Sequence, residues 1–236
     1  MMKLGIIGAM SVEVETIKGQ MKDVSVSAYA GMEFYCGILE GLNAVVVQCG
    51  VGKVNAALCV QILCDRFCAT HIVNTGVAGS LLAELDIGDF VISKDAVYHD
   101  FDCHMLNDNY VVGQVPGLSV RSFPADDFLI ALANAAAEIV HPGHSRVGTV
   151  ASGDQFICDK RIKDKIVADT GAICTEMEGA AIAHAAWRNG VPFVVIRAIS
   201  DKADDSAEMD YPTFEAIAAK RCAAVTQTLA QLMVTN

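Results

Sequence analysis

Positive charge is scarce in this chain of 236 residues. It has 17 lysines and arginines against 28 aspartates and glutamates, a formal net charge of −11, and the basic residues form no cluster. Proteins that bind nucleic acid depend on grouped Lys and Arg side chains to neutralise phosphates. The charge balance therefore argues strongly against a nucleic-acid partner. It also disfavours a highly anionic substrate, unless a local basic pocket overrides the net charge.

Long apolar runs are also missing. None approaches the roughly 20 residues that span a bilayer, and the apolar stretch at the start is too short for a signal peptide before acidic residues follow. The nine cysteines are odd in number and lack CxxC spacing, which is typical of reduced core thiols in a cytosolic protein. We therefore expect a cytoplasmic protein with no membrane association.

No Pro-rich or Ser-rich linker and no internal repeat interrupts the chain. With 53% hydrophobic and 19% charged residues, the chain is long enough to bury most of its apolar surface in one large domain. We expect a single domain that covers residues 1–236.

Several sharp motifs are absent. The segment "GIIGAM" lacks the GxGxxG pattern of dinucleotide binding, and a phosphate loop in "CGVGKVN" would need Gly at Val47 and Ser or Thr at Val54. No GxSxG elbow exists. The run "YHDFDCH", His99 to His104, has no partner cluster with metal-ligand spacing, so we expect no metal and no cofactor. His184 lies in an Ala-rich segment, where a packed core histidine is the expected role.

Short β-branched runs alternate with helical patterns along the chain. Continuous apolar strands interleaved with helices indicate an α/β fold, here a single-domain three-layer αβα arrangement with a mainly parallel or mixed central sheet. The expected strands are Lys3–Ile7, Glu33–Leu39, Ala44–Gln48, His71–Asn74, Asp89–Ser93, Ser145–Ala151, a short run ending at Thr175, and Phe193–Ile199. The expected helices lie near 11–22, 53–68, 125–140, 160–168, 178–189 and 213–233.

The stretch Tyr98–Pro124 shows no clear period. A loop of that length in a compact domain is usually a lid, a binding loop or an interface.

Glycines and carboxylates follow the apolar runs. The segments "CGVGK", "NTGVAGS" and "ASGDQF" each come directly after an expected strand, and glycine lets backbone approach a ligand closely. Because ligands bind beyond the carboxyl ends of strands in open α/β sheets, we expect four carboxylates and one arginine to meet at this edge. They are Glu13, Glu176, Glu178, Asp201 and Arg197, the last within an apolar strand, where a buried arginine must be paired.

Glu176 and Glu178 stand at the entrance to an Ala-rich helix in "CTEMEGAAIAHAA". In an extended segment residues two apart share a face, which favours a joint role at the site. The alternative is that both carboxylates complement the helix macrodipole.

The motifs that carry a family resemblance run from residue 3 to about 220, in order and with compatible spacing. They are "GIIGAM" with Glu13 downstream, "GVGKVNAA", "NTGVAGS", "LDIGDFVIS", "YHDFD", "GQVPG", "SGDQFI", "EMEGAAIAH" and "PFVVIRAISDKAD". The chain resembles the 5'-methylthioadenosine/S-adenosylhomocysteine nucleosidases. "EMEG" and "RAISDKAD" occur across the wider nucleoside phosphorylase superfamily, whereas Glu13 together with "SGDQFI" narrows the resemblance to the hydrolases. The resemblance implies a nucleoside phosphorylase-like fold.

The resemblance implies hydrolysis of the N-glycosidic bond between adenine and a 5'-thio-substituted ribose, in methionine salvage and in removal of S-adenosylmethionine by-products. By resemblance Asp201 protonates N7 of adenine and Ser200 orients it. Glu13 accepts the proton of the attacking water, with Arg197 nearby. An oxocarbenium-like transition state needs this acid and this base. A free aspartate has a pKa of about 3.9, so proton donation requires burial or negative neighbours to raise the pKa of Asp201. We expect this rise once substrate closes the site.

The resemblance also implies contacts to substrate. Glu178 holds the ribose hydroxyls, Met177 packs against the sugar, Phe156 stacks on adenine, and the Ile157 backbone reads the edge of the base. Glu176 is expected to support the local structure or the network of the base. The other expected substrate-binding positions are Met10, Val77, Ala78, Gly79, Tyr211, Cys103 and Leu106.

Some positions depart from the common family pattern. Val77 stands where some relatives carry Ser, which puts a side-chain hydrogen bond there in doubt. Tyr211 fills an aromatic wall position that is often Phe, so we expect a more polar 5' end of the pocket. In this family a neighbouring subunit lends apolar residues to the alkylthio pocket. Cys103 and Leu106 match those positions, which implies a homodimer.

Three alternatives stay open. A purine nucleoside phosphorylase needs a cationic phosphate site, but residues 4–17 contain no Arg or Lys. A non-catalytic adenosine-binding module would not need both Glu13 and Asp201. A hydrolase for a related nucleoside, such as an aminodeoxyfutalosine, is compatible with Val77 and Tyr211.

Overall fold

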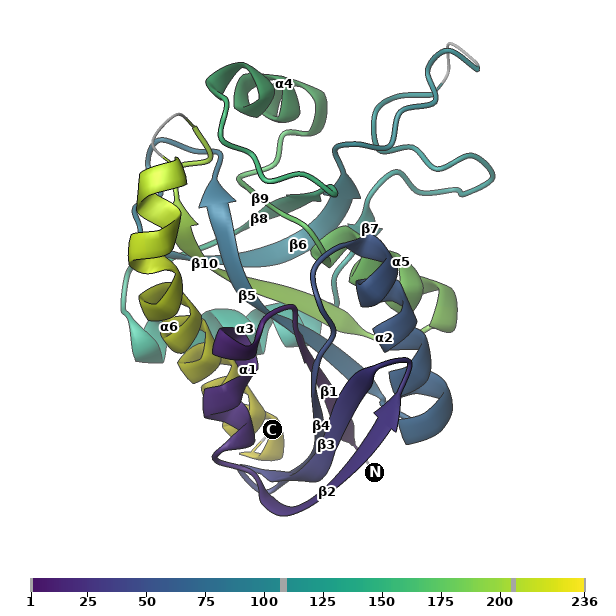
Figure 1. The fold of residues 1–236 in the computed structure, drawn as a ribbon, viewed down its shortest axis with the longest axis vertical. Coiled ribbons are helices and arrows are strands. Elements are labelled where there is room, and N and C mark those ends of the chain that lie inside the picture. The colour runs from purple at the N-terminus through teal and green to yellow at the C-terminus, as the bar shows by residue number, and fades with distance from the viewer. Residues whose placement is uncertain (1, 107–109, 205–206, 236) are drawn as a thin grey trace.

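The computed structural model describes residues 2–106, 110–204 and 207–235, except for the side chains of Glu208 and Met209. The described part of the chain forms strands and helices in alternation (Figure 1). The strands are β1 Lys3–Gly8, β2 Lys22–Tyr29, β3 Met32–Leu39, β4 Leu42–Gln48, β5 His71–Ser80, β6 Phe90–Tyr98, β7 Phe123–Pro124, β8 Ser145–Ser152, β9 Cys174–Glu176 and β10 Phe193–Asp201. The helices are α1 Ser11–Lys18, α2 Lys53–Phe67, α3 Asp127–Val140, α4 Lys160–Thr170, α5 Gly179–Asn189 and α6 Ala207–Thr235.

One mixed sheet organises the fold. Its order is β10-β6-β8-β9-β5-β1-β4-β3-β2, with β7 paired to β6. Parallel pairing joins β1 to β4 and β5, β5 to β10, and β8 to β6 and β9, whereas β2, β3 and β7 pair antiparallel. Strand β10 also pairs with β5, so the path from β5 through β9, β8, β6 and β10 closes on itself. The expected mixed sheet is confirmed, and part of it is closed rather than open.

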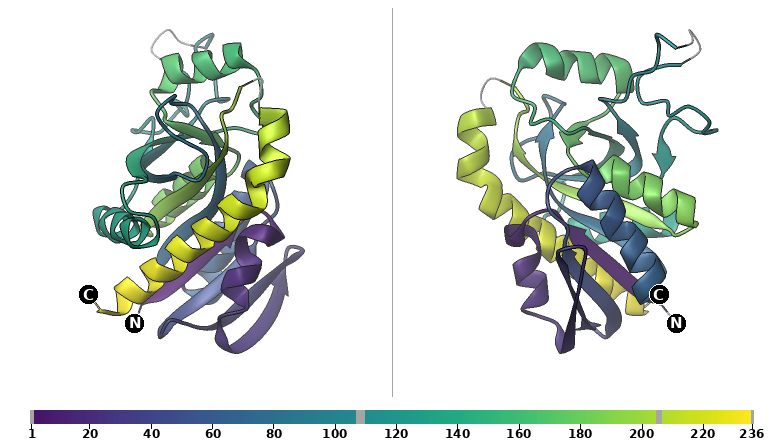
Figure 2. Two further views of the ribbon diagram at one scale, coloured as in Figure 1. Left: turned by 90° about the vertical axis from the view of Figure 1, so that its left-hand side faces the viewer. Right: turned by 45° about the vertical axis from the view of Figure 1, so that its right-hand side comes forward.

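Helices cover both faces of the sheet, which confirms the three-layer expectation (Figures 1 and 2). Apolar residues of α2 and α5 pack with one face, around Val60 and Ile182. Apolar residues of α1, α3 and α6 pack with the other face, around Ile17 and Leu229. Strands β1, β4 and β10 are buried on both sides along most of their length, which explains their nearly continuous apolar sequences.

Two local predictions are wrong. The first helix ends at Lys18 rather than near residue 22, and Lys22–Tyr29 forms the exposed edge strand β2. Strand β2 contains "VSVSA", an alternation of apolar and polar residues that is typical of a strand and that the prediction missed. The strand is exposed along nearly its whole length. The expected turn in "NTGVAGS" is also absent, because β5 continues to Ser80.

Helix α6 starts at Ala207, earlier than expected, and contains Pro212. Proline removes a backbone donor and bends a helix, and Figure 2 shows α6 bending near its start. In the described part of 99–122 the chain forms neither helix nor strand, as expected for the long loop.

None of the nine cysteines, all of which lie in the described ranges, forms a disulfide. The expectation of core thiols is correct only for Cys49, Cys59, Cys174 and Cys222, which are buried, whereas Cys68 is exposed. In the described ranges, no helix has the length and apolar character needed to cross a membrane.

Candidate active site

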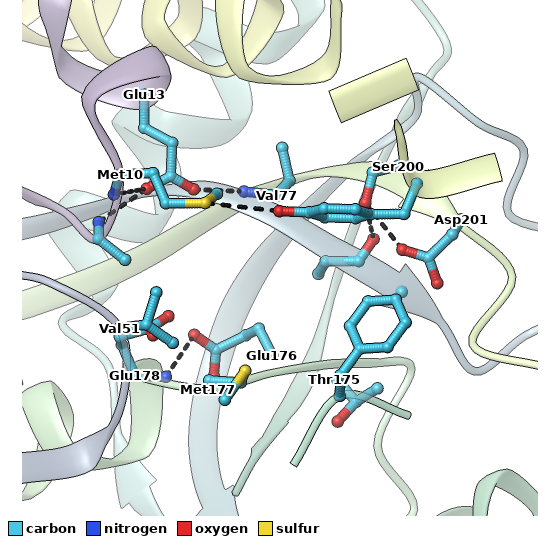
Figure 3. A pocket seen from close by; sticks show the side chains of 15 residues that line it. Met10, Glu13, Val51, Val77, Thr175, Glu176, Met177, Glu178, Ser200 and Asp201 are labelled. Atoms are coloured by element: carbon cyan, nitrogen blue, oxygen red, sulfur yellow. Dashed lines mark hydrogen bonds between the residues drawn. The ribbon is translucent and has the colours of Figure 1, made fainter. Parts of the chain in front are cut away.

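A pocket opens where strands β1, β4, β5, β9 and β10 end (Figure 3). Its walls combine apolar side chains with a few polar groups, as is usual for a small-molecule site. Met10, Val51 and Glu178 lie at one end of the pocket, and Asp201 and Thr175 lie at the other. The lining residues are Ala9, Met10, Glu13, Val51, Val77, Ala78, Gly79, Phe156, Thr175, Glu176, Met177, Glu178, Ser200, Asp201 and Tyr211.

Glu13 is buried at the start of α1 and accepts three backbone hydrogen bonds. Oε2 accepts from the N–H groups of Ala9 at 2.7 Å and Met10 at 2.9 Å, and Oε1 accepts from Val77 N–H at 3.2 Å. Burial raises the pKa of Glu13, opposed by the charge of Arg197 and by these hydrogen bonds. Glu13 is only 3% exposed, unlike Glu15, which lies on the exposed face of the same helix.

Asp201 ends β10 beside Ser200. The Ser200 hydroxyl donates to Oδ2 at 2.9 Å, and Ala203 N–H donates to Oδ1 at 2.8 Å. Burial raises the pKa of Asp201, and the two hydrogen bonds oppose this shift. The direction agrees with the expectation for Asp201. The larger cause is burial, and Asp204 and Asp210 add negative charge.

Glu176 and Glu178 have different surroundings. Glu176 accepts hydrogen bonds from the Ser152 hydroxyl, from the N–H groups of Glu178 and Gly179, and from Arg197. It therefore holds the start of α5 in place. The Glu178 carboxylate accepts one hydrogen bond, from Gly52 N–H at 2.8 Å, and faces the pocket (Figure 3). Burial and the charge of Glu176 raise the pKa of Glu178 to about 7.

Arg197 is 1% exposed and is paired, as expected for a buried arginine. Its guanidinium donates to Glu176 and to Asn74 Oδ1, the latter at 2.5 Å, and lies 3.9 Å from Glu178 Oε2. Arg197 does not line the pocket. Gly76 permits this arrangement, because a Cβ at position 76 would lie 2.4 Å from Glu13 Oε1 and 2.9 Å from Arg197 Nη1.

A smaller hollow continues from the Asp201 end. Six residues line both spaces: Gly79, Phe156, Thr175, Glu176, Met177 and Asp201. The smaller hollow also contacts Gln155 and Ile157. Phe156 is 48% exposed, and its ring meets the Tyr211 ring edge-on at 5.4 Å between centroids. An apolar slot with an aromatic wall suits a flat heterocycle.

The structure brings together most of the predicted residues. Of the predicted set, Ile157 lines the smaller hollow, Arg197 lies behind Glu176, and Cys103 and Leu106 do not line the pocket of this chain. Sequence reasoning missed Ala9, Val51 and Thr175 as lining residues. Their positions directly after β1, after β4 and within β9 could have indicated that they line the pocket. They were missed because their side chains carry no distinctive chemistry.

His184 packs as expected. Its ring stacks on Phe123 with centroids 4.5 Å apart, and its Nδ1 lies 3.2 Å from the Tyr98 hydroxyl. Within residues 2–106, 110–204 and 207–235, no group of three or more His, Cys, Asp or Glu residues is arranged to hold a metal ion.

Comparison with known proteins agrees with this geometry. The family model described as "Phosphorylase superfamily" matches residues 3–231. The 5'-methylthioadenosine/S-adenosylhomocysteine nucleosidase of Geobacillus thermodenitrificans is 40% identical over 94% of this chain and 93% of its own length. The crystal structure of the Neisseria meningitidis enzyme of that name, in complex with methylthio-immucillin-A, is 33% identical with a TM-score of 0.94, covering 98% of this chain and 100% of that one.

A third relative bears on the related-nucleoside alternative. The structure of futalosine hydrolase of Helicobacter pylori is 31% identical with a TM-score of 0.92, covering 98% of both chains. The similarity to the nucleosidases extends over nearly the whole chain, and the sheet, the helical layers and the pocket are built from the motifs that carried the resemblance. This chain belongs to the 5'-methylthioadenosine/S-adenosylhomocysteine nucleosidases of the phosphorylase superfamily.

Proposed function

We propose that this enzyme hydrolyses the N-glycosidic bond of 5'-methylthioadenosine and S-adenosylhomocysteine, with Asp201 as general acid and Glu13 as general base. One observation carries the assignment of roles. Three carboxylates from separate elements, Glu13 of α1, Glu178 before α5 and Asp201 of β10, line one pocket, and burial raises the pKa of each. Groups with such shifted pKa values in a cleft are candidates for acid–base work.

Asp201 supplies a proton to the leaving base. Its raised pKa favours the neutral carboxylic acid, which donates to N7 of adenine. As the bond between C1' and N9 breaks, its electron pair moves into the purine. Because N7 has gained a proton, the released adenine is neutral. The Ser200 hydroxyl and Ala203 N–H hold the carboxyl group in position and then stabilise the carboxylate that remains.

Glu13 activates water. Its carboxylate takes one proton from the water whose oxygen bonds to C1', so that ribose gains a hydroxyl. Three backbone N–H groups and the nearby Arg197 charge favour the ionised form of Glu13, whereas burial makes it a stronger base than a free glutamate. Glu178 and Met177 hold the sugar between the two groups, and the Phe156 ring covers adenine.

The lining favours water over phosphate as the nucleophile. None of the residues that line the pocket is a lysine, arginine or histidine. Arg197, the nearest cation, is engaged by Glu176 and Asn74. A phosphate dianion would meet the Glu13 and Glu178 carboxylates without a free cation to bind it.

We also propose that the enzyme acts as a homodimer. The long loop exposes Met105 by 87% and Leu106 by 76%, and α2 exposes Val54 by 71%. Exposed large apolar side chains of this kind are typical of an interface. A loop from the partner that carries Cys103 and Leu106 would close the Met10 end of the pocket.

The first test is release of adenine from 5'-methylthioadenosine in phosphate-free buffer and with added phosphate. Equal rates and free 5-methylthioribose in both support hydrolysis. Release that requires phosphate and yields a sugar 1-phosphate contradicts it. Cleavage of 6-amino-6-deoxyfutalosine in the same assay measures the second candidate, which the similarity to the Helicobacter pylori futalosine hydrolase favours.

Replacement of the acid tests the assignment to Asp201. We expect Asp201→Asn to lower kcat at least about 100-fold, within the usual range for loss of a general acid, while binding of a 5'-methylthioadenosine analogue persists. Asp127→Asn, a matched change at an exposed position of α3, should leave kcat unaffected. Near-normal turnover by Asp201→Asn would remove Asp201 from the acid role.

A further inference from the structure

Tyr211 links the pocket to a carboxylate outside it. The phenol lies on the first part of α6 and lines the pocket. Its hydroxyl donates to Glu215 Oε1 at 3.0 Å and lies 3.4 Å from Met10 Sδ, the contact marked by the dashed line at the Met10 sulfur in Figure 3. Burial, followed by the charge of Glu215, raises the pKa of Tyr211, so the phenol stays protonated and donates.

The Tyr211 ring meets the Phe156 ring beside the expected position of the purine, but the Tyr211 hydroxyl lies at the opposite end of its side chain, at Met10. Asp201, Phe156 and Thr175 border both the pocket and the smaller hollow, which defines the base end. Met10, Val51 and Tyr211 border only the larger pocket, and Figure 3 shows Met10 and Asp201 at opposite ends. With adenine at Asp201 and ribose at Glu178, the 5' substituent points toward Met10 and the Tyr211 hydroxyl.

The Glu215 carboxylate has no ion pair with a basic side chain among the described residues. By contrast, the other buried or half-buried glutamates of the site lie near Arg197. The Glu215 side chain is half-buried one helical turn beyond Tyr211, and the Tyr211 hydroxyl engages one of its two oxygens. A partly desolvated carboxylate without a counter-charge favours a cationic ligand group.

We propose that Tyr211 and Glu215 form a recognition site for an ammonium group on the 5' substituent of the nucleoside, so that this enzyme favours S-adenosylhomocysteine over 5'-methylthioadenosine. The inference rests on the proposed function. In S-adenosylhomocysteine two methylene groups separate the sulfur from the carbon that bears the ammonium, so the ammonium extends past Met10 to the Glu215 carboxylate. The methyl group of 5'-methylthioadenosine ends at Met10 and carries no charge.

The test compares kcat/KM for three nucleosides in the full-length enzyme. They are S-adenosylhomocysteine, its deamino analogue, which keeps the tail carboxylate but lacks the ammonium, and 5'-methylthioadenosine. We expect Glu215→Gln to lower the ratio of kcat/KM for S-adenosylhomocysteine to that for 5'-methylthioadenosine by about 10-fold to 150-fold, the range for loss of a hydrogen bond to a charged group. Glu84→Gln, a matched change at an exposed site, should keep the ratio.

Each further result decides the proposal. Tyr211→Phe keeps the ring but releases Glu215, and it should lower the same ratio by a smaller factor. In Glu215→Gln the ratio for the deamino analogue should stay at the wild-type value, because the ammonium is absent. An unchanged ratio for S-adenosylhomocysteine, or an equal loss for the deamino analogue, would overturn the ammonium site. Failure of the wild type to cleave any of the three would instead contradict the proposed function.

Discussion

Glu176 and Glu178 are two residues apart and perform separate tasks. Glu176 is saturated with hydrogen bonds from Ser152, from backbone N–H groups and from Arg197. Glu178 has one backbone donor and faces the pocket. A carboxylate that leaves acceptor sites free can bind ribose hydroxyls, whereas a saturated one cannot. This difference supports the assignment of Glu178 to the sugar and of Glu176 to the framework.

The raised pKa of Glu178 predicts a pH-dependent cost in stability. Its folded-state pKa of about 7 lies above the ordinary value of 4.5, so the stability that protonated Glu178 contributes is lost as the pH rises through about 7. Gln cannot ionise. We therefore expect Glu178→Gln to be more stable than the wild type at pH 8.5, by roughly 1–3 kcal/mol, with the difference shrinking toward pH 5. Thermal unfolding of the wild type and of Glu178→Gln at both pH values measures this difference, with Glu84→Gln as the control. A stability difference that does not change with pH would contradict the prediction.

Replacement of Glu176 by Gln should change the free energy of unfolding in the opposite direction. Its removal leaves the buried Arg197 without its principal partner, and loss of one member of a buried ion pair costs about 3–5 kcal/mol. Glu176→Gln should therefore lower the free energy of unfolding in urea at pH 8.5, where Glu178→Gln raises it. A Glu176→Gln variant as stable as the wild type would show that Asn74 and Glu178 suffice for Arg197.

At the scale of elements, the site depends on a close approach between β5, β10 and the start of α1. Glycine at position 76 of β5 leaves room for both Glu13 and Arg197, which lie close to the position that a Cβ would occupy. Val77 then follows with a backbone N–H on Glu13. The position thus needs a residue without Cβ for reasons of space, since no unusual backbone angle is required there.

Replacement of this glycine should displace the base. The Cβ of Gly76→Ala would lie within 2.4 Å of Glu13 Oε1, so the carboxylate must move. A displacement of about 1 Å typically costs about 100-fold in rate, and we expect kcat/KM for 5'-methylthioadenosine to fall by at least that factor. Gly19→Ala, where the nearest atom to the added Cβ is 3.4 Å away, serves as the control. Equal activity of the two variants would show that the Glu13 position is not critical.

At the scale of the whole molecule, the long loop after β6 carries exposed apolar side chains on a chain whose net charge is −11. Leu106 belongs to this loop but does not border the pocket of its own chain. Contact with a second copy would bury Leu106 and bring it to the pocket of the partner, which is the arrangement that the homodimer proposal requires.

A charge at Leu106 should therefore affect assembly and activity together. Burial of a leucine contributes about 1.5–3 kcal/mol, so Leu106→Glu should raise the dimer dissociation constant at least tenfold. Sedimentation velocity over a dilution series measures this shift, and kcat/KM for 5'-methylthioadenosine should fall in parallel. Ile139→Glu, at a 63% exposed position of α3, is the control. A wild type that sediments as a monomer at all concentrations would end the dimer proposal.

Most of the fold could be predicted from local patterns. Strands β1, β4 and β10 are apolar because they are covered on both faces, and the helices between them repeat near 3.6 residues, so burial and period coincide. The edge strand β2 was missed because it lacks the continuous apolar run of the buried strands, although "VSVSA" within it alternates apolar and polar residues. The extent of β5 past Asn74 was also missed, since Gly76 and Gly79 are typical of turns unless a neighbouring side chain needs the space.

The sequence by itself determined the alternation of strands and helices, the acidic inventory of the site, and the family to which the chain belongs. These features depend on residue type and spacing, which the sequence contains directly. Only the tertiary structure decided which groups Glu176 contacts in the framework, that part of the sheet closes between β5 and β10, and that Tyr211 reaches Glu215 beside Met10. Each of these depends on distances between segments far apart in the chain, and hydrogen-bond saturation, burial and the resulting pKa shifts follow from those distances alone.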